Sequence, residues 1–208
     1  MRIEKLEKSK HKQERVLVYL EGGDLLRITE SELLRFGLYR GLDISQETVV
    51  ELRKCGASSE TRAQAANIIS SRALSKSELK RRLIKKGAQE DDADGAIEYL
   101  ERLGAVDDAA YAAMLVRHYS AQGYGEARVR DELFRRGVPR ELWDEALAEI
   151  PDTQEIIEKY VLSKMKGKTL DSKGYKRLCD ALLRRGFRWG DVKAVMNRLG
   201  AQITCEDD

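Results

Sequence analysis

One short segment carries residue types that could hold a phosphate group. Gly167-Lys168-Thr169 resembles the end of a phosphate-binding loop, in which backbone N–H groups and a lysine surround the phosphates. That loop also needs a glycine five residues before Gly167, and the sequence has Leu162 there. We therefore expect no nucleotide site.

A second segment has the spacing of a calcium loop. Within Glu90–Glu101, Asp92 and Asp94 stand at ligand positions and Gly95 at the turn position. The first ligand would be Glu90 rather than aspartate, and acidic residues are also favoured at the start of a helix by its dipole. We expect a helix here and no calcium.

The remaining residues that could bind a metal or act as nucleophiles are scattered. His11 and His118 are the two histidines, and no pair with the spacing of a zinc site occurs. Cys55, Cys179 and Cys205 lie far apart, which is typical of free thiols in a reducing compartment. No apolar run has the length of a signal peptide or a membrane span. These patterns predict a cytoplasmic, non-enzymatic protein without cofactor, metal or membrane.

The basic residues are more informative, although the net charge is only +2. Residues 72–88 hold seven bases and one acid, whereas residues 89–110 hold eight acids and one base. Repeated basic helices suit a polyanion, although the same bases could merely offset helix dipoles and attract acidic helices. We predict that contacts with DNA or another long polyanion are made by Lys80, Arg81, Arg82, Lys85, Lys86, Arg128, Arg130, Arg135, Arg136, Lys176, Arg177, Arg184 and Arg185.

These bases belong to a repeat marked by Gly87, Gly137 and Gly186. Each glycine follows two bases and suits a left-handed helix end. Apolar residues at eight, four and three positions before each glycine predict one buried helix face, which ends in Ile84, Phe134 and Leu183. A second helix is predicted by apolar residues at six, nine, ten and thirteen positions after the glycine, namely Ala93, Ala96, Ile97 and Leu100 with their counterparts Trp143, Ala146, Leu147, Ile150, Val192, Val195, Met196 and Leu199.

A further helix is expected before each pair, at about Ser59–Arg72, Asp107–Gln122 and Asp152–Lys166, with its first residue as the N-cap. We therefore predict a mainly α protein with three tandem three-helix repeats in an elongated, curved array. The repeats are expected at residues 57–105, 106–151 and 152–208.

Residues 1–56 form a separate N-terminal segment in this prediction. A β-hairpin is expected from Arg15–Leu20 and Leu25–Ile28 around a Gly-Gly turn, with Ile3–Leu6 as a third strand. Thr29–Phe36 is predicted to be a short helix with a capping box. Asp43–Cys55 is predicted to be another helix, which ends at Gly56.

The sequence of the repeats resembles the RecX family. The resemblance is carried by SRALSKSELKRRLIKKG at 71–87, IEYLERLGAVDDAAYAAMLVRHY at 97–119 and GYGEARVRDELFRRGVPRELWDEAL at 123–147. With the third copy it extends over about residues 57–200. That copy departs in its longer loop, Gly167–Gly174, and in Cys179, which replaces a base.

The resemblance implies a regulator built from three-helix units that binds along the groove of the RecA filament on single-stranded DNA. Such proteins inhibit the ATPase activity, strand exchange and extension of the filament, and they are not enzymes. We expect a monomer with weaker direct DNA binding, in which basic helices face DNA and acidic helices face protein. Two alternatives stay open: a DNA-binding protein independent of RecA, and a protein–protein adaptor.

Overall fold

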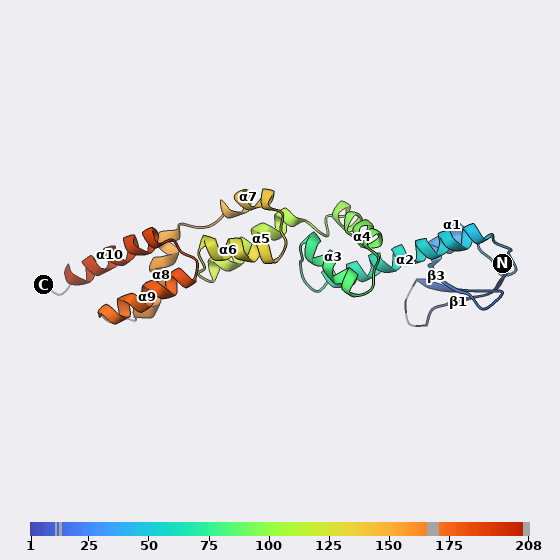
Figure 1. Cartoon of the computed structure of the whole chain (residues 1–208), viewed down its shortest axis with the longest axis horizontal. Helices are drawn as coiled ribbons and strands as arrows, with labels where there is room; N and C mark the ends of the chain where they lie inside the picture. Colours follow the sequence, from blue (N-terminus) through green and yellow to red (C-terminus); the bar gives the residue numbers. More distant parts are fainter. Residues whose placement is uncertain (11, 13, 166–170, 206–208) are drawn as a thin grey trace. The chain divides into compact units, whose positions relative to one another are not determined.

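The computed structural model describes residues 1–10, 12, 14–165 and 171–205, and for 201–205 only the course of the helix. The chain forms two compact units: residues 1–73 with 78–106, and residues 74–77 with 107–208. The predicted mainly α fold with a small N-terminal sheet is confirmed (Figure 1). The repeat boundaries and the elongated, curved arrangement stay predictions. Gly167-Lys168-Thr169 lies outside the described residues.

Unit 1 begins with a three-stranded antiparallel sheet in the order β1-β2-β3. The strands are β1 (Ile3–Lys8), β2 (Arg15–Leu20) and β3 (Leu25–Thr29), which confirms the hairpin and its third strand. Gly22 and Gly23 both have positive φ in the turn, as a tight hairpin requires. One face of the sheet buries Val16, Val18, Leu26 and Ile28.

The first helix, α1 (Glu30–Arg35), is fixed by the predicted capping box. The Thr29 hydroxyl accepts a hydrogen bond from the Glu32 backbone N–H, and the Glu32 carboxylate accepts one from the Thr29 N–H. This reciprocal pair satisfies two donors that a helix start leaves unpaired.

The second helix, α2 (Gln46–Ile69), corrects the prediction. It does not end at Gly56, and Ser59 lies inside it rather than at an N-cap. Gly56 is buried against β3, where an added Cβ would lie 2.3 Å from the Arg27 carbonyl oxygen. Glycine is needed here because two backbones meet, and not because the helix stops.

Arg15 strengthens this contact between the sheet and α2. Its guanidinium is 7% exposed and donates to the Gly56 carbonyl at 3.3 Å and to the Ser59 hydroxyl at 2.8 Å. A carboxylate oxygen of Glu60 lies 3.5 Å from the same guanidinium. In Figure 1, α2 extends from the sheet to α3 (Lys76–Lys85) and α4 (Glu90–Arg102), and α2 packs on α4.

Unit 2 holds the other two repeats. Its helices are α5 (Asp108–Ala121), α6 (Glu126–Arg135), the 3-10 turn η1 (Arg140–Leu142), α7 (Trp143–Leu147), α8 (Thr153–Met165), α9 (Ser172–Arg184) and α10 (Trp189–Cys205). Asp107 caps α5 as predicted, because its carboxylate accepts from the backbone N–H groups of Ala109 and Ala110. The Asp152 carboxylate likewise accepts from Gln154, at the start of α8.

The apolar pattern after each glycine is also confirmed. Eleven of the twelve predicted positions are buried, and Ile150 packs against the core of its repeat. Gly87, Gly137 and Gly186 have φ of 94°, 67° and 88°. In each copy, the buried leucine four residues before the glycine accepts a hydrogen bond at its carbonyl oxygen from the N–H of the residue after the glycine. For example, Val138 donates to Leu133 at 3.0 Å. This is the glycine-dependent helix end expected from the sequence.

Candidate nucleic-acid interface

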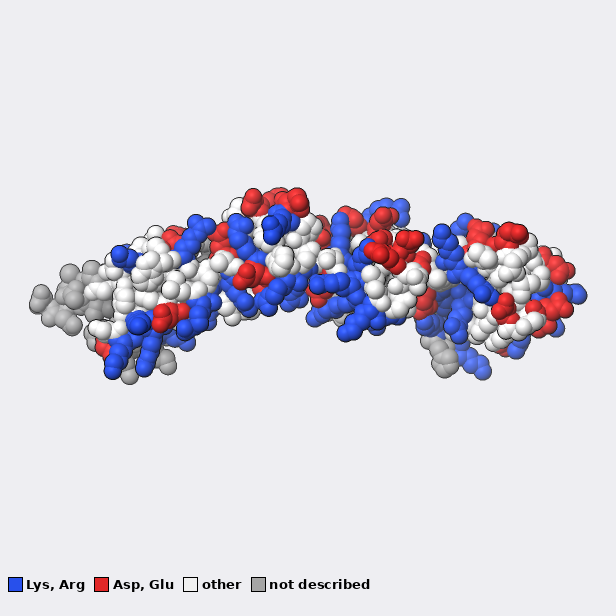
Figure 2. Space-filling view, in the orientation of Figure 1, with Lys and Arg blue, Asp and Glu red and all other residues white. Residues whose placement is uncertain are grey.

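The predicted contact residues lie on α3, α6 and α9 or directly after them. Because each helix ends at a left-handed glycine, its last bases stand at the carboxyl end of the helix, where they offset the helix dipole. In Figure 2, acidic side chains gather over α4 and basic ones over α3 within unit 1. In unit 2, acidic side chains gather over α7 and basic ones over α9.

In repeat 1, two of the predicted bases are held by carboxylates. The Lys80 ammonium lies 2.8 Å from both Glu90 and Asp94, and hydrogen bonds to Asp94 and then Glu90 raise its pKa above the usual value. Arg82 donates to Glu78 at 2.7 Å. Lys80 thus joins α3 to α4, and Arg82 pairs with a residue of its own helix, so both bases stabilise the fold of repeat 1.

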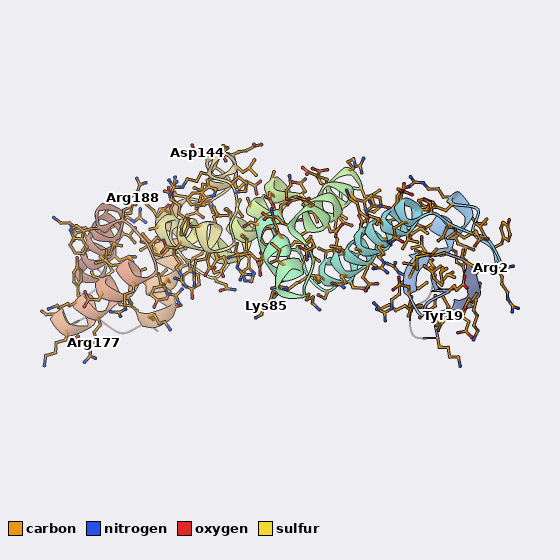
Figure 3. All side chains as sticks on the ribbon, turned by 45° about the vertical axis from the view of Figure 1, so that its right-hand side comes forward. Arg2, Tyr19, Lys85, Asp144, Arg177 and Arg188 are labelled. Carbon is orange, nitrogen blue, oxygen red and sulfur yellow. The ribbon has the colours of Figure 1, made fainter. Side chains whose placement is uncertain are left out.

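The other bases of repeat 1 face outward. Arg81, Lys85 and Lys86 are exposed. Within the described part of the chain, Lys85 and Lys86 have no carboxylate within ion-pairing distance, and Figure 3 shows Lys85 extending away from its helix. This pair is therefore available to an external anion.

In repeat 2, all four predicted bases are engaged by acids. Glu132 is 5% exposed and contacts Arg128 at 3.5 Å, Arg136 at 3.7 Å and Arg135 more closely. Three guanidinium groups thus surround one buried carboxylate, which sequence reasoning missed. The signal was present, because Glu132 lies four residues after Arg128, three before Arg135 and four before Arg136.

The fourth base of repeat 2, Arg130, is also paired. Its Nε donates to Glu126 at 2.8 Å, and its Nη2 lies 3.8 Å from Asp144. Figure 3 shows Asp144 on the outside of unit 2. The bases of this repeat therefore stabilise the repeat itself and offer less charge to a ligand than the sequence indicated.

In repeat 3, Lys176, Arg177 and Arg184 are exposed, and among the described residues none of the three has an acidic partner. Figure 3 shows Arg177 pointing outward from α9. These three residues, together with Lys85 and Lys86, are the predicted contact residues whose charge is not neutralised.

Arg185 has a different role from its neighbour Arg184. Its guanidinium lies 4.5 Å from the ring centroid of Tyr160 and 5.0 Å from that of Tyr124. It also donates to the carbonyl groups of Gln122 and Gly123, both at 3.0 Å. Arg185 therefore joins the second and third repeats within unit 2.

The backbone reinforces this junction. The Gly125 N–H donates to the Arg185 carbonyl at 2.9 Å, so the end of α9 meets the start of α6. An added Cβ on Gly125 would lie 2.4 Å from the Gly186 carbonyl oxygen, which explains why glycine stands there. Sequence reasoning missed the junction because its partners are distant in the chain.

The apolar residue before each basic pair corrects another prediction. Ile84, Phe134 and Leu183 were expected on the buried face, but they are 44%, 65% and 41% exposed. Each lies one residue after a buried leucine, and one residue turns the side chain by about 100° around the helix. The buried face of the helix before each glycine is therefore narrower than the apolar residues of the sequence predicted.

The described residues include no group of His, Cys, Asp and Glu side chains that could hold a metal ion. The Glu90–Glu101 segment forms most of α4. Cys55 and Cys179 are free thiols, and burial raises the pKa of Cys179. Over the described part of the chain, no helix combines the length and apolar character needed to cross a membrane.

Comparison with known proteins gives a consistent result. The family model of the first three-helix domain of RecX matches residues 62–100, and that of the second matches residues 107–147. The regulatory protein RecX of Geobacillus kaustophilus (strain HTA426) is 31% identical over 199 residues, which cover 92% of this chain and 74% of that protein. The regulatory protein RecX of Clostridioides difficile (strain 630) is 24% identical over 202 residues, or 95% of each chain.

Solved structures agree on the fold. A crystal structure of regulatory protein RecX superposes with a TM-score of 0.74 at 20% identity, covering 94% of this chain and 98% of the other. The crystal structure of RecX from Lactobacillus salivarius gives a TM-score of 0.62 at 20% identity, with coverage of 69% and 96%.

Proposed function

Because this chain belongs to the RecX family of regulatory proteins, we propose that it binds a RecA filament on single-stranded DNA and inhibits it. The inhibited steps are the ATPase activity, strand exchange and extension of the filament. Binding alone produces the effect, without catalysis or a cofactor, and the protein acts in the cytoplasm.

The observation that carries the proposal is a set of exposed bases for which the described residues provide no ion pair. Lys85 and Lys86 end α3, while Lys176, Arg177 and Arg184 lie on α9. Exposed bases on equivalent helices of a repeat protein suit a partner that is itself repetitive and negatively charged. Each base that contacts a phosphate of a single strand adds about 0.7 to the slope of log affinity against log salt.

The bases already paired within the protein contribute less to this binding. Glu132 and Glu126 hold the four bases of repeat 2 in ion pairs, and Arg185 is held between two tyrosines. Of the thirteen predicted contact residues, five are thus expected to make the principal contacts.

The test is the ATPase activity of RecA on single-stranded DNA, titrated with this protein. We expect the activity to fall at substoichiometric amounts. A variant with Lys176, Arg177 and Arg184 changed to glutamine should inhibit less, whereas Lys54→Gln, an exposed change on α2, should inhibit normally. Unchanged ATPase activity at equimolar protein would refute the proposal.

A protein–protein adaptor is the second candidate, favoured by the 65% exposure of Phe134. Large exposed aromatic side chains are typical of protein contact sites. An adaptor would bind its partner with little dependence on salt and would be insensitive to the glutamine changes on α9. A DNA-binding protein independent of RecA would instead bind bare DNA as tightly as the filament.

A further inference from the structure

Unit 1 has a groove beside the second half of α2 that the sequence did not indicate. Two clefts of about 760 and 490 Å³ share Asn67 and Lys86 in their walls, so they adjoin. Together they follow α2 from Glu60 to its end at Ile69, a distance of about 14 Å at about 1.5 Å per residue, and reach Ser71 just beyond it.

The walls of the groove are polar and mostly basic. Five bases and two acids line the two clefts. At one end Glu60 pairs with Lys12 and Arg15, and with Glu14 in the same wall these two bases face two acids. Lys85 and Lys86 supply the charge that is not balanced, beside the side chains of Asn67 and Ser71.

Comparison of the repeats explains why this charge is unbalanced. Lys85-Lys86 occupies the position of Arg135-Arg136, fifty residues later. There the buried Glu132 contacts both arginines, whereas the equivalent residue of repeat 1 is Arg82. The counterion of repeat 2 is thus replaced by a third base in repeat 1. Arg82 is itself held by Glu78 at 2.7 Å, so among the described residues Lys85 and Lys86 have no carboxylate of α3 within ion-pairing distance.

We propose that this groove binds the sugar–phosphate backbone of single-stranded DNA, with Lys85 and Lys86 on the phosphates and Asn67 as a hydrogen-bond donor. The side chains that the structure describes around the groove include no aromatic ring. A backbone ligand is therefore favoured over stacked bases.

The inference rests on the proposed function for the identity of the strand, but it can be tested without RecA. The probe is a fluorescent oligonucleotide of ten thymidines, and its anisotropy with the full chain is measured from 50 to 200 mM salt. Changing Lys85 and Lys86 together to glutamine should weaken binding and lower the salt slope by about 1.4, since two phosphate contacts are lost. Lys54→Gln, an exposed change on α2 outside the two clefts, should leave the affinity and the salt slope unchanged.

A second pair of variants, which have the same net charge as each other, tests the groove. Asn67→Asp places a carboxylate beside Lys86 and should weaken binding several-fold, whereas Asn197→Asp on α10 should have no effect. Both asparagines are exposed, so folding is preserved.

Three outcomes would overturn the proposal: an unchanged slope in the Lys85/Lys86 variant, equal effects of the two aspartate variants, or displacement of the oligonucleotide by a ten-residue polyglutamate peptide at lower concentration than by unlabelled oligonucleotide. The last outcome would assign the groove to an acidic protein segment. Because oligonucleotide binding is measured alone, a failure of RecA inhibition is seen separately in the ATPase titration.

Discussion

Replacing Gly56 with alanine tests the contact that joins α2 to the sheet. An alanine Cβ at this position would lie 2.3 Å from the Arg27 carbonyl oxygen and 3.3 Å from its carbon. Both are backbone atoms of a paired strand, so no side-chain rotation relieves the overlap. The helix or the strand must move by about 1 Å, and the hydrogen bond from Arg15 to the Gly56 carbonyl must move with it.

Two opposing effects decide the sign of the change in stability. Alanine favours the helix over glycine by about 1 kcal/mol. Overpacking of a close contact costs about 1–3 kcal/mol, and the upper end applies because the atoms are backbone. We therefore expect a net loss of about 2 kcal/mol, or about 4–8 °C in melting temperature for a chain of this size.

Gly95→Ala is the matched control. Gly95 also lies inside a helix, α4, but an added Cβ would meet no atom within 4 Å. This variant should therefore gain up to about 1 kcal/mol. Urea unfolding of the two variants measures both effects. If Gly56→Ala is stabilised as Gly95→Ala is, the close contact between α2 and β3 is refuted.

Three further changes test the roles assigned to single residues. Glu132→Gln should destabilise the protein by about 1–3 kcal/mol in urea unfolding and raise its affinity for a thymidine oligonucleotide, because three guanidinium groups lose their counterion; lower or equal DNA affinity would contradict this view. Arg185→Ala should lower stability by about 1–3 kcal/mol through the lost tyrosine and carbonyl contacts, whereas Arg184→Ala should keep stability and lower the salt slope by about 0.7; the reverse pattern would exchange their roles. Phe134→Ser should change stability by less than about 0.5 kcal/mol, while Leu133→Ala next to it should cost about 2–5 kcal/mol, and a large loss in the serine variant would place Phe134 in the core.

Much of the fold was predictable because the same local pattern occurs three times in the sequence, and each copy supports the interpretation of the other two. A glycine after two bases, followed by apolar residues at helical spacing, correctly identified the end of one helix and the buried face of the next, whereas Ile84, Phe134 and Leu183 were wrongly predicted to be buried. Gly56 shows where this reasoning fails. A glycine after an apolar helical segment indicates a helix end, yet the approach of β3 requires a glycine inside the helix, and that approach is a tertiary property.

The candidate site was less predictable, for a related reason. The sequence places bases on a helix but does not choose their partners. Glu132 could have been found from its spacing along α6, whereas the pairing of Arg185 with Tyr124 and Tyr160 joins residues 61 and 25 positions apart. The groove beside α2 likewise depends on how α3 is placed against that helix, which no local pattern encodes.

The uninterrupted course of α2 has a consequence for how unit 1 unfolds. One helix carries both the contact with the sheet at Gly56 and the packing on α4. If either the sheet or α4 separates from α2, apolar surface that the helix shares with both of them becomes exposed. The N-terminal sheet and the first repeat should therefore act as one cooperative unit, and hydrogen exchange should give the same opening free energy for the slowest backbone amides of both. A truncation that begins at Ala57 would remove the first half of this helix and leave Ala65 and the surface beneath α4 less protected, although the repeat as read from the sequence would still be complete.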